Sequence, residues 1–291
     1  LNEYFTFQNI FSYNTLFKDV TMLPPANIAE VSSNTSAIIH NSWWDYDFSN
    51  TDDKINFSDS KKITKELFEQ AVKNQMVSDV PLGSYLSGGM DSGSITAIAS
   101  KQVSRLATFT CGFDMNEVSG IESNFDERRD AEFMANHFKT EQYEQVMNSD
   151  DIKWCLPKLV YHLEDLRAGM SYPNYYISRL ASKFVKVCLQ GTGGDELFGG
   201  YPWRYLKTAN SNSFDDYIDD YYLYWQRLVN NSELKKLFSP IWKDVKDIWT
   251  KDIFRNVFST YENELTSPED YVNHSLYFEA KTFLHGLFVV E

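Results

Sequence analysis

Cysteine is scarce in this chain of 291 residues. Only Cys111, Cys155 and Cys188 are present, and they lie far apart in the sequence. A disulfide framework needs an even set of cysteines, and a zinc site needs closely spaced cysteines or histidines. We therefore exclude both classes and predict three reduced thiols. The five histidines also lack metal-site spacing, and we predict structural roles for them.

Basic residues are in short supply as well. Lysine and arginine total 27 against 41 aspartates and glutamates, which gives a net charge of −14. Such a surface repels nucleic acid and anionic membranes. No apolar run approaches the ~20 residues that a bilayer span requires, and no signal peptide is visible. We predict a cytoplasmic protein with neither nucleic acid nor membrane as a partner.

What the chain does contain is a glycine-rich loop between a predicted strand and a predicted helix. The strand covers residues 80–86, the helix covers residues 92–101, and S-G-G-M-D-S stands between them at residues 87–92. Glycines let backbone N–H groups approach an anion, and a helix directs its first N–H groups and positive dipole end at the same point. The pattern predicts a phosphate-binding loop, in which Ser87 and Ser92 add hydroxyl donors.

Asp91 places an acid inside this loop, which has no lysine to offset the charge. A carboxylate repels phosphate unless a divalent cation bridges the two. We therefore predict Mg²⁺ with Asp91 as a ligand. The alternative is a plain serine and glycine turn in which Asp91 only caps the helix.

A second loop repeats the pattern after a predicted strand at residues 184–189. It reads G-T-G-G-D-E from Gly191 to Glu196 and continues as L-F-G-G-Y. In an open parallel sheet, ligands bind at the carboxyl ends of the strands. Two such loops on neighbouring strands are expected to face one anion, which makes Asp195 the second predicted metal ligand.

Strand and helix patterns alternate over residues 82–189, which predicts an α/β fold with a doubly wound parallel sheet. Beyond Pro202 we predict a mainly helical half. The predicted strands are 105–111 and 142–146; the predicted helices are 61–76, 126–138, 152–163 and 172–183; residues 117–124 are a predicted loop.

We predict a hairpin and turn region over residues 1–30 and a polar connection over residues 32–50. Glu127–Asp130 is predicted as a solvated helix start. The helical half has a predicted core stripe of Ile218, Tyr221, Tyr222, Trp225 and Leu228.

These motifs resemble those of a known family. S-G-G-M-D-S is similar to the pyrophosphate loop (PP-loop) of ATP pyrophosphatases, which have the adenine nucleotide alpha hydrolase-like fold. Together with V-P-L-G-S-Y-L before it and G-T-G-G-D-E-L-F-G-G-Y later, it resembles the synthetase domain of glutamine-dependent asparagine synthetases. The similarity runs over most of residues 1–205. It implies a carbon–nitrogen ligase that uses Mg²⁺-ATP to adenylate a carboxylate, the aspartate side chain, before an amine displaces AMP.

The resemblance also implies residue roles and partners. The implied catalytic residues are Thr192, Asp195, Glu196 and Arg167, although Arg167 could equally form an ion pair at a helix end. The implied metal ligands are Asp91 and Asp195. The implied nucleotide-binding residues are Leu86, Ser87, Gly88, Gly89, Asp91, Ser92, Cys111, Gln190 and Gly191. The implied partners are ATP, aspartate or another carboxylate, ammonia from glutamine, and a glutaminase domain of the same parent chain; a homodimer is compatible with them.

Thr192 departs from the family pattern, because asparagine synthetases usually carry a glutamate at this point, as in S-G-E-G-S-D-E. A hydroxyl cannot replace a carboxylate base that deprotonates the incoming amine. Another acceptor, such as a sugar acid or a lactam precursor, therefore stays open. So does a non-catalytic nucleotide-binding fragment.

The ends of the chain resemble parts of larger domains. Residues 1–50 resemble the tail of a class II glutaminase domain and a linker, without its nucleophilic cysteine. Residues 51–291 then form the synthetase domain, and residues 281–291 resemble the segment just before the family's R-V-P-F-L-D region. We expect a fragment of a longer protein, truncated at its C-terminus.

Overall fold

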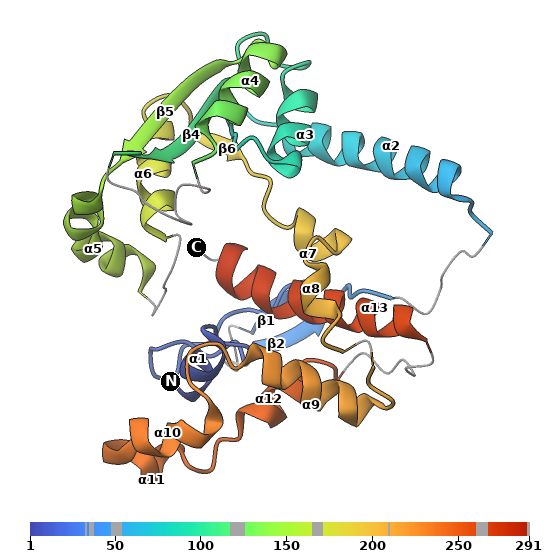
Figure 1. The fold of residues 1–291 in the computed structure, drawn as a ribbon, viewed down its shortest axis with the longest axis vertical. Helices are drawn as coiled ribbons and strands as arrows, with labels where there is room; N and C mark the ends of the chain where they lie inside the picture. The colour runs from blue at the N-terminus through green and yellow to red at the C-terminus, as the bar shows by residue number, and fades with distance from the viewer. Residues whose placement is uncertain are drawn as a thin grey trace. The chain divides into compact units, whose positions relative to one another are not determined.

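The computed structural model describes residues 1–32, 34, 38–47, 54–116, 126–164, 171–208, 210–259 and 267–289. The chain divides into two compact units, whose helices and strands are labelled in Figure 1. Unit 1 consists of Leu1–Thr51, Glu164–Arg167 and Gly193–Glu291, and unit 2 consists of Asp52–Leu163 and Ala168–Thr192. The predicted loop at residues 117–124 lies outside the described residues.

Unit 2 is built on a parallel sheet with the strand order β5-β4-β3-β6. Strands β5, β4 and β6 are labelled in Figure 1. Its strands are β3 (Leu82–Tyr85), β4 (Ala107–Phe113), β5 (Glu141–Met147) and β6 (Val187–Leu189). Strand β3 lies inside the sheet, because Ser84 pairs with Thr108 of β4 on one side and with Leu189 of β6 on the other. The ends of β3 and β6, which both lead into glycine-rich loops, are therefore neighbours.

Helices fill the connections between these strands. They are α2 (Phe57–Gln75), α3 (Met90–Ala99), α4 (Arg128–Phe138), α5 (Ser149–Leu163) and α6 (Ser171–Ala181). The predicted alternation of strand and helix is confirmed. Helix α2 begins earlier than predicted because Asn56 caps it, accepting a hydrogen bond from the Asp59 N–H at 3.0 Å. Val72 of this helix is buried, whereas Ile63 and Leu67 are exposed.

The helices of unit 2 cover both faces of the sheet. Phe109 of β4 packs with Ile177 and Ala181 of α6. Leu106, directly before β4, packs with Ala99 of α3. Odd and even residues along a strand point to opposite faces. The α/β doubly wound parallel sheet predicted from the sequence is therefore present.

Unit 1 is mainly helical, as predicted for the region beyond Pro202. Its elements are α1 (Asn2–Phe7), β1 (Asn27–Val31), β2 (Ile38–Ser42), α7 (Gly194–Phe198), α8 (Pro202–Tyr205), α9 (Phe214–Trp225), α10 (Asn231–Leu237), the 3-10 turn η2 (Ser239–Ile241), α11 (Trp242–Val245), α12 (Thr250–Asn256), α13 (Pro268–Glu279) and the π-helical segment η3 (Ala280–Val289). Its core is aromatic, with Trp225, Tyr221 and Phe254 fully buried. Large aromatic side chains supply this burial at few positions.

The predicted core stripe on α9 is confirmed for four of its members and wrong for Leu228, which is 44% exposed. Helix α9 ends at Trp225, and Gln226 has a non-helical ψ of 80°. The helical register that would bury Leu228 therefore stops before reaching it.

Two predictions near the N-terminus are wrong in part. The predicted hairpin and turn region does contain an antiparallel bridge between Asn14 and Thr21. Residues Asn2–Phe7 form a helix where a hairpin and turn region was predicted, and the Glu3 carboxylate accepts hydrogen bonds from the N–H groups of Phe11 and Ser12 after that helix. The predicted polar connection contains strand β2, which pairs antiparallel with β1. Nearly every residue of this hairpin is exposed, so burial imposes no alternating sequence pattern on it.

The predicted thiols are confirmed, because Cys111, Cys155 and Cys188 are all unpaired. Within the described parts of the chain, none of the helices carries an apolar stretch as long as a membrane crossing demands.

Candidate functional site

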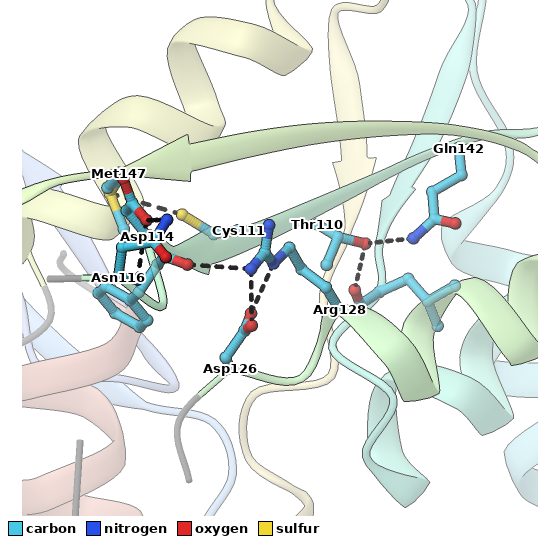
Figure 2. A network of polar contacts seen from close by, with 10 residues as sticks. Thr110, Cys111, Asp114, Asn116, Asp126, Arg128, Gln142 and Met147 are labelled. Carbon is cyan, nitrogen blue, oxygen red and sulfur yellow. Dashed lines mark hydrogen bonds and ion pairs between the residues drawn. The ribbon is translucent and has the colours of Figure 1, made fainter. Parts of the chain in front are cut away.

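The first glycine-rich loop begins at a fixed point between β3 and α3. The Leu86 N–H donates to the Phe109 carbonyl at 2.9 Å, and the Thr110 hydroxyl donates to the Leu86 carbonyl at 2.8 Å. Gln142 of β5 donates in turn to Thr110 Oγ1 at 3.1 Å, as Figure 2 shows. Two neighbouring strands thus set where the loop leaves the sheet.

Ser87 and Ser92 close the loop through their hydroxyl groups. Their Oγ atoms lie 2.9 Å apart, and the Ser87 N–H donates to Ser92 Oγ at 3.1 Å. The Gly89 N–H donates to Ser87 Oγ at 3.3 Å. Helix α3 begins at Met90 with Gly89 as its N-cap, and its N-cap has no side-chain hydrogen bond. The first N–H groups of a helix lack carbonyl partners within that helix, so this end suits an anion.

Gly88 needs to be glycine for two reasons. Its φ is +87°, and a Cβ at this position would lie 2.7 Å from the Cβ of Asp130. The loop therefore packs directly on the first turn of α4. This contact brings a second helix to the predicted phosphate-binding loop.

The second glycine-rich loop touches the first within unit 2. A Cβ at Gly191 would lie 2.7 Å from the backbone nitrogen of Ser92 and 3.0 Å from the Asp91 carbonyl carbon. Gln190 and Thr192 flank this glycine, and the Gln190 amide donates to Thr192 Oγ1 at 2.5 Å. The structure thus brings Ser87–Ser92 and Gln190–Thr192 together at the carboxyl ends of β3 and β6.

Two other predicted nucleotide-binding residues lie beside this loop. The Leu86 side chain is 1% exposed and packs with Ala131 and Ala135 of α4. Cys111 lies on β4 with its Sγ 3.6 Å from the Met147 sulfur, and burial raises the pKa of its thiol to about 11. Their contact with adenine stays a prediction.

The start of α4 is held in place by Arg128. Its guanidinium donates to both carboxylate oxygens of Asp126, at 2.7 and 2.8 Å, and to the Phe113 carbonyl at 3.0 Å (Figure 2). The hydrogen bonds from Arg128 hold the pKa of Asp126 below its ordinary value. This two-point contact with one carboxylate fixes orientation as well as distance.

Glu127 lies between these two residues. Like Arg129 and Asp130 it is exposed, so the predicted solvated helix start is confirmed for these three residues. Partial removal from water raises the pKa of Glu127. The prediction is wrong for Arg128, which is partly buried and ion-paired with Asp126.

Asp195 lies in unit 1, in the first turn of α7. The helix follows Gly193, whose φ is +106°, and the Gly200 N–H donates to the Asp195 carbonyl at 2.8 Å. A Cβ at Gly200 would collide with the Asp195 carboxylate. The G-G-D-E-L-F-G-G sequence thus folds so that glycine backbone lies against the predicted metal ligand.

Glu196 is buried in unit 1, with 2% of its surface exposed. The Tyr201 hydroxyl donates to Glu196 Oε1 at 3.0 Å, and burial raises the pKa of Tyr201. The other predicted catalytic residue, Arg167, lies outside the described residues.

Sequence reasoning missed a buried ion pair in unit 1. Arg204 of α8 donates to Glu279 of α13 at 2.8 Å, and the Tyr221 hydroxyl donates to the same carboxylate at 2.8 Å. Burial raises the pKa of Glu279 to about 7, although Arg204 and Tyr221 act to lower it. Each residue stands singly in an aromatic-rich helical pattern, so no spacing in the sequence signals the pair.

Fold and site together define an α/β protein with paired glycine-rich loops at the carboxyl ends of adjacent parallel strands. The family model for asparagine synthase matches residues 64–291. The chain therefore belongs to the asparagine synthase family.

Curated relatives agree with this assignment. The chain is 35% identical over 156 residues to asparagine synthetase [glutamine-hydrolyzing] 1 of Bacillus subtilis, covering 51% of this chain and 24% of the relative. It is 29% identical over 245 residues to asparagine synthetase [glutamine-hydrolyzing] 3 of the same organism, covering 78% of this chain and 36% of the relative. It is 31% identical over 182 residues to asparagine synthetase B [glutamine-hydrolyzing] of Escherichia coli, covering 56% of this chain and 30% of the relative. The chain thus spans only about a third or less of the length of these relatives.

Proposed function

We propose that this chain is the ATP-using part of an amide-forming ligase, which activates a carboxylate by adenylation. The observation that carries the proposal is the contact between the Gly191 backbone and the first turn of α3. It joins two glycine-rich loops into one anion-binding edge of the sheet. Membership of the asparagine synthase family supports the same reaction class.

In this proposal the first loop binds the ATP phosphates. Gly88 and Gly89 allow backbone N–H groups to approach them, and Ser92 adds a hydroxyl donor. Helix α3 begins at this loop, so the positive end of its dipole stabilises the negative charge of a bound phosphate. The adenine is proposed to lie at the strand ends, near Cys111 and Gln190.

The donor set fits Mg²⁺. No group of three or more acidic, histidine or cysteine side chains that could hold a metal occurs within the described ranges. Mg²⁺ does not need such a group, because proteins bind it through one or two carboxylates plus phosphate oxygens and water. We assign Asp91 and Asp195 as its ligands. When bound, the ion neutralises phosphate charge that Asp91 alone would repel.

The proposed chemistry has two steps. An oxygen of the acceptor carboxylate attacks the α-phosphorus of ATP, which forms an acyl-adenylate and breaks the bond to pyrophosphate. The nitrogen of ammonia then attacks the acyl carbon, loses a proton and displaces AMP. The loops contribute by holding the phosphates in line and by stabilising the charge that builds up on pyrophosphate.

The acceptor we propose is the aspartate side chain, with ammonia supplied from glutamine by a glutaminase domain. Thr192 favours a second candidate, a ligase for another carboxylate such as a sugar acid or a lactam precursor. Its hydroxyl is hydrogen-bonded by Gln190 and cannot act as a carboxylate base. Glu196 is buried against Tyr201, so we propose that another base deprotonates the amine in either candidate.

Pyrophosphate exchange tests this function. The full-length protein is incubated with ATP, Mg²⁺, labelled pyrophosphate and a panel of carboxylic acids. Label entering ATP only with aspartate supports the first candidate, and label entering with another acid supports the second. ATP binding without exchange for any acid would leave a non-catalytic nucleotide-binding module and contradict the proposal.

A further inference from the structure

Strand β4 extends beyond its neighbour β3 at the carboxyl edge of the sheet in unit 2. The pairing of β3 with β4 ends at Tyr85 and Phe109. The pairing of β4 with β5 continues as far as Phe113 and Met147. The last residues of β4 therefore have a strand on one side only, and the peptide groups of such an edge can bond to another molecule.

The direction of the peptide groups along β4 follows from its hydrogen bonds. In a strand, the N–H and C=O of successive residues point to opposite neighbours. Even-numbered residues face β5, and the Asp114 N–H just after β4 still donates to the last carbonyl of β5 at 2.7 Å. Odd-numbered residues face β3, since the Phe109 carbonyl accepts the Leu86 N–H at 2.9 Å. The peptide groups of Cys111 and Phe113 therefore point to the side that β3 has left.

Thr110 ends the ladder between β3 and β4. A continued parallel ladder would pair the Cys111 N–H with the Leu86 carbonyl. Instead the Thr110 hydroxyl donates to that carbonyl at 2.8 Å, and within the described ranges no backbone hydrogen bond joins Cys111 to Leu86. The N–H and C=O of Cys111 thus form a donor and an acceptor side by side at the edge of the sheet.

Arg128 covers this edge one step further along β4. Its guanidinium donates to the Phe113 carbonyl at 3.0 Å and is held by two hydrogen bonds to Asp126, as Figure 2 shows. Its stem crosses Gly112, where a Cβ would lie within 2.4 Å of Arg128 Cδ. The side chains of Arg128 and Asp126 are only 25% and 12% exposed. The pair is therefore packed against the strand and confines a ligand of this edge to Cys111.

The N–H and C=O of Cys111 match the Watson–Crick edge of adenine, the edge by which proteins read a base. Adenine places an acceptor, N1, beside a donor, its 6-amino group. A 6-oxopurine such as hypoxanthine reverses this order, with a donor N1–H beside the acceptor O6. It matches the edge one step further along, at the Cys111 C=O and the Phe113 N–H. Arg128 occupies that step, because it crosses Gly112 and binds Phe113.

We propose that Arg128 is a specificity-determining residue that selects adenine over 6-oxopurines by covering the edge of β4 beyond Cys111. The inference rests on the proposed function, since it takes a purine nucleotide as the ligand. Arg128 acts by occupying the second position along the edge and contributes nothing to the binding of the phosphates.

The variant Arg128→Ala tests this proposal. Calorimetry measures the binding of ATP, ITP and tripolyphosphate to the full-length protein, each with excess Mg²⁺. The quantity compared is the ratio of the ITP Kd to the ATP Kd. We expect this ratio to fall about tenfold, which is the value of about one regained hydrogen bond. The Kd of tripolyphosphate should stay within about twofold of wild type, because the glycine-rich loop is unchanged.

Arg129→Ala is the matched control, because it removes the same charge from the next, exposed residue of α4. It should leave the ratio at the wild-type value. Asp126→Asn replaces Arg128→Ala if the latter does not fold. It removes the carboxylate that holds the guanidinium, and the ratio should fall in the same direction.

A ratio that stays the same or rises in Arg128→Ala overturns the inference. So does an equal loss of affinity for ATP, ITP and tripolyphosphate, which would make Arg128 a support of the whole loop. Wild-type protein that binds neither ATP nor tripolyphosphate defeats the proposed function itself, a different result from either of these.

Discussion

The backbone of Gly191 lies against the amide nitrogen of Ser92, at a distance that leaves no space for a methyl group. Ser92 belongs to α3 and Gly191 follows β6, so the contact joins elements about a hundred residues apart in the sequence. Because β3 and β6 are paired, this contact lies at the carboxyl edge of the sheet. It makes the two glycine-rich loops one structural element within unit 2.

Gly191→Ala should destabilise the protein. The new Cβ would lie 2.7 Å from the Ser92 nitrogen and 3.0 Å from the Asp91 carbonyl carbon, so backbone has to move. We expect a loss of about 1–3 kcal/mol in the free energy of unfolding, measured by urea denaturation. Gly89→Ala is the control, because its φ of −71° is ordinary and its nearest neighbour would lie at 3.3 Å. Equal stability of the two variants would contradict the contact.

Gly200→Ala should weaken the binding of Mg²⁺-ATP. A methyl group at this position collides with the Asp195 carboxylate and turns it away from its present direction. We expect an effect of about tenfold on Kd, comparable to the loss of one charge-assisted ligand. Phe198→Ala, at an exposed position of α7, is the control and should bind normally. If Gly200→Ala binds Mg²⁺-ATP as tightly as wild type, the assignment of Asp195 as a metal ligand is contradicted.

Glu279→Gln should change how stability depends on pH. The pKa of Glu279 is raised from an ordinary 4.5 to about 7, chiefly by burial. The folded protein therefore holds this proton more tightly than the unfolded chain. Its contribution to stability is complete below about pH 4.5 and is lost as the pH rises through about 7.

The measurement is urea denaturation of wild type and variant at about pH 5 and about pH 8. From about pH 5 to about pH 8, the free energy of unfolding of Glu279→Gln should rise by on the order of 2 kcal/mol relative to that of wild type. Glu233→Gln, at an exposed position of α10, should follow wild type throughout. Parallel pH profiles for Glu279→Gln and wild type would show that this carboxyl does not titrate in the range.

The fold of unit 2 could be predicted because its signals are local. The strands before each glycine-rich loop and the amphipathic pattern of α4 are all readable within short windows of sequence. The hairpin of β1 and β2 escaped prediction because Ile28, Ile38 and Ile39 are exposed. With no buried face, the strands have no alternating pattern to reveal them.

The candidate site could be proposed from the sequence for the same reason. Glycines, hydroxyls and acids in one short loop point to phosphate without any tertiary information. The contact between Gly88 and Asp130 depends on how α4 packs on the loop, and the pair of Arg204 and Glu279 joins residues 75 positions apart. Contacts of this kind are set by the packed fold, so neither left a pattern in the sequence.

The most direct test of the account is a double-mutant cycle on Asp91→Asn and Asp195→Asn, with Mg²⁺-ATP binding measured by calorimetry. If both acids hold one ion, each single variant should weaken binding at least about tenfold, and the double variant should bind about as weakly as the worse single variant. Losses that multiply in the double variant, or affinities that ignore both substitutions, would contradict a shared metal between the two loops.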